Sequence, residues 1–152
     1  MFVTGPMHLQ AMSGGASHQF QQARLRAWLS QLWAAITHRS RRLLELSVEM
    51  SKVKLAEQHY AGIRAVPIRQ IHGSESRATD FDREFNPLSD RIRQRWTSVF
   101  NAWQKDVPLP PVDLIQMGDT YFVRDGHHRI SVAHTLGQEY IEAAVTLWRV
   151  KC

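Results

Sequence analysis

The fold is decided by residues 112–137, which read VDLIQMGDTYFVRDGHHRISVAHTLG. Two short apolar runs flank Gly118-Asp119, a dipeptide typical of a tight hairpin turn. Asp125-Gly126 ends the second run, and a helix is predicted over residues 127–136. Gly137 then stands where a glycine commonly ends a helix. This stretch therefore predicts a β-hairpin that leads directly into a helix.

The junction between the hairpin and the helix has features of an anion site. Gly126 has no Cβ, so it permits a tight turn and close approach by a ligand. The first amides of the following helix point outward with a partial positive charge, which suits a phosphate. Arg129 adds a fork of donors for phosphate oxygens, and His128 adds a donor whose charge depends on pH. The alternative is a purely structural turn, since many strand–glycine–helix junctions bind nothing.

Elements on either side of this stretch complete an α+β pattern. Residues 65–71 alternate as a short strand, and Ser89-Asp90 is a capping sequence for a helix that runs to about Lys105. That helix places large apolar side chains on one face, where core packing is favoured over stacking on nucleic-acid bases: Ile92, Trp96, Val99, Phe100 and Trp103. Prolines 108, 110 and 111 end it, and residues 141–150 alternate as a closing strand.

These motifs together resemble a known superfamily. The run Leu109-Pro110-Pro111-Val112, the hairpin and Gly126-His127-His128-Arg129 look like the N-terminal domain of ParB chromosome-partitioning proteins. In that family a Leu-Pro-Pro strand leads to a Gly-Glu-Arg-Arg helix start, and sulfiredoxin places Gly-Cys-His-Arg at the same turn. Residues 64–87 are similar to the preceding segment of short bacterial ParB-like proteins. The resemblance implies a ParB/sulfiredoxin-like small mixed sheet with helices, preceded by an N-terminal helical extension.

The resemblance also implies a function. In both families this helix start holds the phosphates of a nucleotide, so Gly126, His127, His128 and Arg129 are the expected phosphate-binding residues, with Tyr121 and Asp125 as additional candidates. The implied ligand is a nucleoside triphosphate such as CTP or ATP, with Mg²⁺ as a further candidate. Asp125 is expected to cap the helix rather than to bind Mg²⁺. The implied role is a nucleotide-binding module that is regulatory or associated with DNA.

Departures from the family pattern limit which activities of these families can be expected of this chain. His127 stands where ParB has glutamate and where sulfiredoxin has its reactive cysteine. Sulfinic-acid reduction is not expected, because Cys152, the single cysteine, is the last residue. Loss of the glutamate also weakens the case for nucleotide hydrolysis. The alternatives are a DNA- or partner-binding adaptor without nucleotide, or a superfamily enzyme such as a nuclease or small kinase.

Two other groups of polar residues are candidate metal sites. His127 and His134 share a helix face but lie two turns apart, about 10 Å, which is too far for one metal ion. The acidic cluster of residues 80–90 has the composition of a divalent-metal site as found in nucleases. It is interleaved with arginines, so surface ion pairs are the favoured interpretation. No metal site is predicted.

The N-terminal third differs from the rest in charge. Residues 1–58 hold seven Arg or Lys against three Glu, whereas residues 59–152 are almost balanced. Residues 1–18 are expected to form a flexible leader, 19–59 a basic helical extension and 60–152 the ParB/sulfiredoxin-like domain. Residues 19–37 and 40–59 have helical periodicity, which fits either an αα-hairpin or one long bent helix.

The extension offers basic and apolar surfaces. Its Arg and Lys side chains suggest contacts with DNA phosphates: Arg24, Arg26, Arg39, Arg41, Arg42, Lys52 and Lys54. Its apolar face suggests a homodimer or docking onto the domain, and docking is favoured because Trp28 and Trp33 would otherwise face water. Neither a secretory signal nor a run of about 18 apolar residues is seen, so a cytoplasmic protein is expected.

Overall fold

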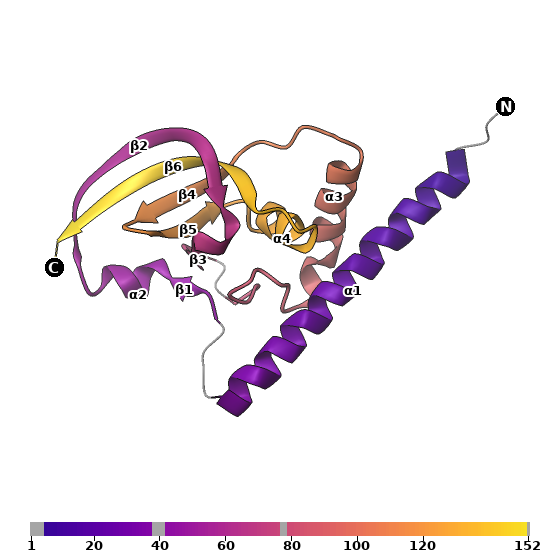
Figure 1. Cartoon of the computed structure of the whole chain (residues 1–152), viewed down its shortest axis with the longest axis horizontal. Helices are drawn as coiled ribbons and strands as arrows, with labels where there is room; N and C mark the ends of the chain where they lie inside the picture. The colour runs from indigo at the N-terminus through magenta and orange to yellow at the C-terminus, as the bar shows by residue number, and fades with distance from the viewer. Residues whose placement is uncertain (1–4, 38–41, 77–78, 152) are drawn as a thin grey trace.

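The computed structural model describes residues 5–37, 42–76 and 79–151. Its regular elements are, in chain order, α1 (Gly5–Thr37), β1 (Leu44–Glu45), α2 (Leu46–Met50), β2 (Lys54–Pro67), the 3₁₀ turn η1 (Ile68–Gln70), β3 (Ile71–Ser74), the 3₁₀ turn η2 (Asp90–Ile92), α3 (Arg93–Gln104), β4 (Val112–Met117), β5 (Thr120–Asp125), α4 (His127–Thr135) and β6 (Tyr140–Lys151). Figure 1 shows the sheet with α3 and α4 on one side and α1 running past them.

The six strands form one mixed sheet in the order β1-β3-β5-β4-β6-β2. β3 and β5 run parallel, as do β4 and β6, whereas β4–β5 and β2–β6 are antiparallel. The α+β fold class with a small mixed sheet is therefore confirmed. Parallel pairing places the carboxyl ends of β3 and β5 at the same edge of the sheet, and α4 begins there.

The central strands are covered on both faces. In β5, Tyr121 and Val123 belong to the main core, while Phe122 points to the opposite face with Ile115 and Leu46. Alternation along a strand explains this division, because successive side chains point to opposite faces. α3 and α4 therefore cover one face, and α2 covers the other.

The packing of α3 and α4 agrees with the sequence prediction. Ile92, Trp96 and Phe100 are buried, and Val99 and Trp103 pack against them, so core packing of this face is confirmed. The Trp96 indole N–H donates to Ser131 Oγ at 2.8 Å, which ties α3 to α4 inside the core. The Ser89 hydroxyl accepts a hydrogen bond from the Arg91 amide, as the predicted cap requires.

The prediction for residues 40–59 was wrong. Within the described part, residues 42–59 form β1, the one-turn helix α2 and the first half of β2, so neither an αα-hairpin nor a long bent helix is present. β2 pairs with β6 from Lys54↔Lys151 to Pro67↔Tyr140, and this cross-strand pairing overrides the local helical pattern. The sheet therefore begins before residue 60. Residues 5–18, expected in a flexible leader, belong to α1.

The docking expected for the N-terminal helix is only partly found. α1 packs on α3, but Trp28 and Trp33 are 58% and 61% exposed, so the expectation that the domain covers them was wrong. In the described residues, no helix combines the length and the apolar composition that a membrane span requires.

Candidate functional site

Gly126 forms a turn that only glycine fits. It is the N-cap of α4, with φ of 109° and ψ of 20° in the left-handed region. A Cβ at this position would lie 2.5 Å from Val112 Cγ1 and 2.7 Å from Val112 Cβ. The Gly126 carbonyl accepts the first helical hydrogen bond, from the Ile130 amide at 3.0 Å. Both the backbone conformation and the closeness of β4 therefore require glycine.

His127 and His128 point into the protein. They are 4% and 9% exposed, and both rings contact the Phe81 ring, His127 by stacking at 6.0 Å and His128 edge-on at 5.5 Å. His127 Nε2 lies 2.6 Å from Ser74 Oγ, at the end of β3. The imidazoles thus fasten the start of α4 to β3 and to the loop that carries Phe81. A ligand at this turn would therefore contact the backbone of residues 126–129 rather than the buried imidazole rings.

Arg129 lies across the turn and holds the Leu-Pro-Pro segment. One of its terminal nitrogens, Nη1, donates to the carbonyls of Pro110 and Pro111, and the other, Nη2, donates to Asp125 Oδ2 at 3.2 Å. These contacts use three of the five N–H donors of a guanidinium. The Arg129 side chain is 15% exposed and the Asp125 side chain is 76% exposed, so solvent reaches this ion pair from the Asp125 side.

Asp125 does not cap α4. Gly126 is the N-cap and provides no side-chain cap, while the Asp125 carboxylate accepts the hydrogen bond from Arg129. The expectation that Asp125 is a helix cap was therefore wrong. A carboxylate one residue earlier than the N-cap lies outside the position from which side chains reach the first amides.

Tyr121 lies away from the turn. It is at the start of β5 and Gly126 follows its end, a separation of about 16 Å at the rise of an extended strand. Its ring is buried, and its hydroxyl accepts a hydrogen bond from Arg64 of β2 at 3.3 Å. The structure thus brings together Asp125, Gly126, His127, His128 and Arg129, but not Tyr121.

Sequence reasoning missed the contribution of β3 to this edge of the sheet. Ser74 is 1% exposed and supports His127, and the next residue, Glu75, pairs with Arg124 at 3.3 Å. The signal was Gly73-Ser74, shortly after the strand predicted over residues 65–71. A Cβ on Gly73 would lie 2.3 Å from the Phe122 ring, so glycine lets β3 and β5 approach closely.

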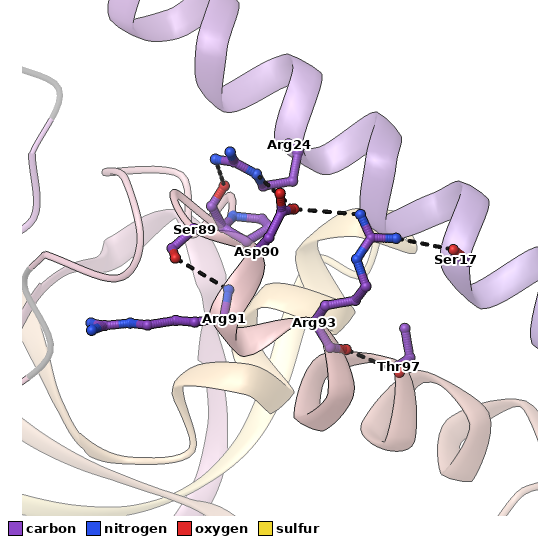
Figure 2. Close-up of polar contacts among 8 residues, drawn as sticks. Ser17, Arg24, Ser89, Asp90, Arg91, Arg93 and Thr97 are labelled. Atoms are coloured by element: carbon purple, nitrogen blue, oxygen red, sulfur yellow. Dashed lines mark hydrogen bonds and ion pairs between the residues drawn. The ribbon is translucent and has the colours of Figure 1, made fainter.

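Asp80 and Asp90 of the acidic cluster form ion pairs, as predicted. Asp80 accepts from Arg91, and Asp90 contacts both Arg93 and Arg24 of α1. Figure 2 shows the Asp90 carboxylate between the two guanidiniums, with Arg93 also reaching Ser17. Asp82 accepts hydrogen bonds from the amides of Glu84 and Asn86, each at 2.9 Å, and so shapes the turn after Phe81. Burial raises the pKa of Asp82.

Two cavities lie beside α4. One, of about 370 Å³, has Arg129, Val112, Trp103, Tyr140 and Glu142 among its lining residues. The second, of about 490 Å³, is lined by His72, His134, Arg83 and Glu84. Burial lowers the pKa of both histidines, and the Arg83 charge lowers that of His72 further. The first cavity adjoins the turn, because Val112 also contacts Gly126.

Comparison with solved structures finds a fold likeness. The crystal structure of sulfiredoxin from Arabidopsis thaliana matches with a TM-score of 0.41 and 19% identity, over 55% of this chain and 82% of that chain. No protein-family model matches the sequence, and no curated protein is similar to it. At this level of similarity the comparison assigns no activity.

Proposed function

We propose that this chain is a nucleotide-binding module that holds the phosphates of a nucleoside triphosphate at the start of α4. The observation that carries the proposal is the left-handed turn at Gly126, which heads a nine-residue helix beside the Arg129 guanidinium. The positive end of a helix dipole and a guanidinium both favour an anion. Two N–H donors of Arg129 remain beyond those that hold Pro110, Pro111 and Asp125.

The neighbouring cavity supports a ligand larger than phosphate. Its volume of about 370 Å³ is within the range of small-molecule sites. Trp103 and Tyr140 in its wall offer aromatic faces for a base, and Glu142 offers an acceptor for a sugar hydroxyl or an amino group. Phosphates beside Arg129 and a base in this cavity are compatible, since Arg129 lines both places.

Calorimetric titration with CTP, ATP and GTP, with and without Mg²⁺, tests the proposal. We expect Arg129→Gln to weaken binding by about 10- to 100-fold, the usual worth of a charge-assisted hydrogen bond. Arg95→Gln, at an exposed position on α3, is the matched control and is expected to bind as the wild type does. No heat and no saturation for the wild type at millimolar nucleotide would refute the proposal.

Arg129 also stabilises the fold, so a second variant is needed. Arg129→Lys keeps the charge but loses the forked contacts with Pro110 and Pro111. If the guanidinium serves only the Leu-Pro-Pro segment, both variants lower the melting temperature and neither changes the affinity of the folded protein. If it binds phosphate, Arg129→Lys retains more affinity than Arg129→Gln.

Binding of DNA by the N-terminal third has less support. Arg24 pairs with Asp90, the Arg26 guanidinium contacts Thr135, and Lys52 pairs with Glu49, so these cations already have acceptors within the chain. Arg39 and Arg41 lie outside the described residues. A shift of labelled duplex that weakens steeply with salt, and is lost on replacing Arg24 and Arg26 with Gln, would favour this alternative over the nucleotide site.

A further inference from the structure

α1 has two apolar faces, and in the described residues the domain covers one of them. The inner stripe, spaced by three and four residues, consists of Ala16, Phe20, Ala23, Ala27 and Ser30, all buried. These side chains are mostly small, which lets α1 lie close to α3, where Phe20 meets the Trp96 ring edge-on at 5.4 Å. The Arg93 guanidinium lies 4.8 Å from the centre of the Phe20 ring. This face fixes the helix to the domain.

The outer stripe lies on the opposite side of the same helix. It consists of Leu25, Trp28, Leu29, Leu32, Trp33 and Ile36, which are 55%, 58%, 44%, 46%, 61% and 65% exposed. Phe20 and Leu29 are nine residues apart, which is about 180° around a helix at about 100° per residue. In Figure 1 the sheet, α3 and α4 all lie on one side of α1. In the described part of the chain, all six side chains are exposed.

The outer stripe is large enough for a specific interface. Its six side chains expose roughly 700 Å² of apolar surface, given that a large aromatic side chain offers about 150–250 Å². This area exceeds the usual largest apolar patch of a monomer, about 300–600 Å². It approaches the ~800 Å² that each partner contributes to a standard protein interface.

The positions of the outer stripe are spaced symmetrically along the helix. Its positions are spaced by three, one, three, one and three residues, and its side chains run Leu, Trp, Leu, Leu, Trp and Ile. The centre of symmetry lies between Ser30 and Gln31. A second α1 that runs antiparallel about that centre therefore places an apolar side chain of the stripe at every level. Leu29 of one copy is level with Leu32 of the other, and Leu25 with Ile36.

We propose that two copies of this chain pair through antiparallel α1 helices. Leu25, Leu29, Leu32 and Ile36 follow the four-three-four spacing of a coiled-coil seam, and the tryptophans flank this seam on its two sides. The arrangement is an isologous interface, in which the same patch serves both copies. It is independent of the nucleotide site.

Charge also favours a second copy as the occupant. Residues 27–37 include no charged side chain, so pairing the stripe with itself opposes no like charges. A helix that lies on a membrane surface generally has Lys and Arg along its polar face. In α1 the face opposite the outer stripe is the inner stripe, which is packed on α3. A membrane surface therefore fits this helix less well than an identical helix does.

Sedimentation velocity of the full chain over a range of concentrations tests the proposal. We expect the wild type to dimerise and the variant Trp28→Gln/Trp33→Gln to associate at least about 100-fold more weakly, because buried tryptophans dominate interface energies. The matched control is Tyr60→Gln/Ile63→Gln on β2, where the two side chains are 61% and 56% exposed, and it is expected to dimerise normally. Circular dichroism confirms that each variant is folded.

Three results would overturn the proposal. One is a wild type that stays monomeric at the highest concentration, and another is a folded Trp28→Gln/Trp33→Gln variant that dimerises as well as the wild type. The third is loss of the dimer in the β2 control, which would move the interface to the free edge of the sheet. A monomeric wild type that sediments with phosphatidylglycerol vesicles, unlike the tryptophan variant, would identify a membrane as the occupant.

Cysteine cross-linking tests the direction of pairing. In a Cys152→Ser background, we expect a mixture of Leu29→Cys and Leu32→Cys proteins to form a disulfide faster than either protein alone, because these positions are level in the antiparallel pair. Parallel helices would place each position beside itself, so faster cross-linking in the single proteins would refute the antiparallel arrangement.

Discussion

Replacing Gly126 with alanine tests the physical basis of the turn. The new Cβ would lie 2.5 Å from Val112 Cγ1 and 2.7 Å from Val112 Cβ, at a φ of 109°. The left-handed backbone costs a residue with a Cβ about 1–2 kcal/mol. Overpacking against β4 adds about 1–3 kcal/mol. We therefore expect Gly126→Ala to lower the free energy of unfolding by about 2–5 kcal/mol.

Gly137 provides the matched control for the steric part. It also has a positive φ, of 77°, but a Cβ there would meet nothing within 4 Å. Gly137→Ala therefore has the conformational cost without the clash. The difference between the two variants isolates the contact with Val112. It amounts to about 1–3 kcal/mol, or roughly 2–12 °C in melting temperature for a chain of this size.

Urea unfolding followed by tryptophan fluorescence measures both variants on one scale, provided that the slopes against urea agree. Adding Val112→Ala to Gly126→Ala is expected to recover part of the loss, since it removes Cγ1 but keeps the Cβ. If Gly126→Ala is no less stable than Gly137→Ala, the close approach of β4 does not explain the glycine, and the reasoning is refuted.

Two further predictions concern the core and its response to pH. Ser131→Ala leaves the buried Trp96 indole N–H without its acceptor and is expected to lower the free energy of unfolding in urea by about 1–3 kcal/mol. Ser98→Ala, at an exposed position of α3, is the control and is expected to change it by almost nothing. Equal losses in the two variants would contradict the role of this hydrogen bond. Burial lowers the pKa of His134 below its ordinary 6.5, so as the pH falls through 6.5 the unfolded state takes up the proton first and stability decreases. Unfolding measured from pH 7 down to the lowered pKa should show a smaller decrease in His134→Gln, and an unchanged slope would rule out this histidine as the cause.

The second half of the fold could be predicted because its signals are local. Gly118 and Gly137 both have positive φ, and each marks a turn within a few residues of the elements it joins. At the end of α4, the Gln138 amide donates to Ala133 and the Gly137 amide to His134, the hydrogen bonds of a glycine helix end. A short stretch of sequence contains all the partners that these turns need.

The first half could not be predicted in the same way. β2 is defined by β6, and its side chains are exposed at nearly every position, so its sequence has no buried face to reveal a strand. In α1 the spacing of the large apolar residues predicts one face that holds Phe20 together with Trp28 and Trp33. The buried face is built instead from alanines around Phe20, which a count of large side chains overlooks.

The candidate site was only partly accessible to sequence reasoning. Gly126 and Arg129 were placed correctly at the turn, but the direction of the His127 and His128 rings depends on Ser74 and Phe81, which are far away in the sequence. A motif identifies which residues meet at a turn. It does not determine which of them face inward.

The pairing of β2 with β6 has a consequence for biosynthesis. Lys54 and Lys151 are partners although 97 positions separate them (151 − 54), whereas β4 and β5 meet across a two-residue turn. Contacts between distant segments form late, since the loop between them must close first. During translation, β2 therefore leaves the ribosome long before β6 is made. Its polar side chains then favour solubility of the waiting strand: Lys54, Glu57, Gln58, His59 and Arg64.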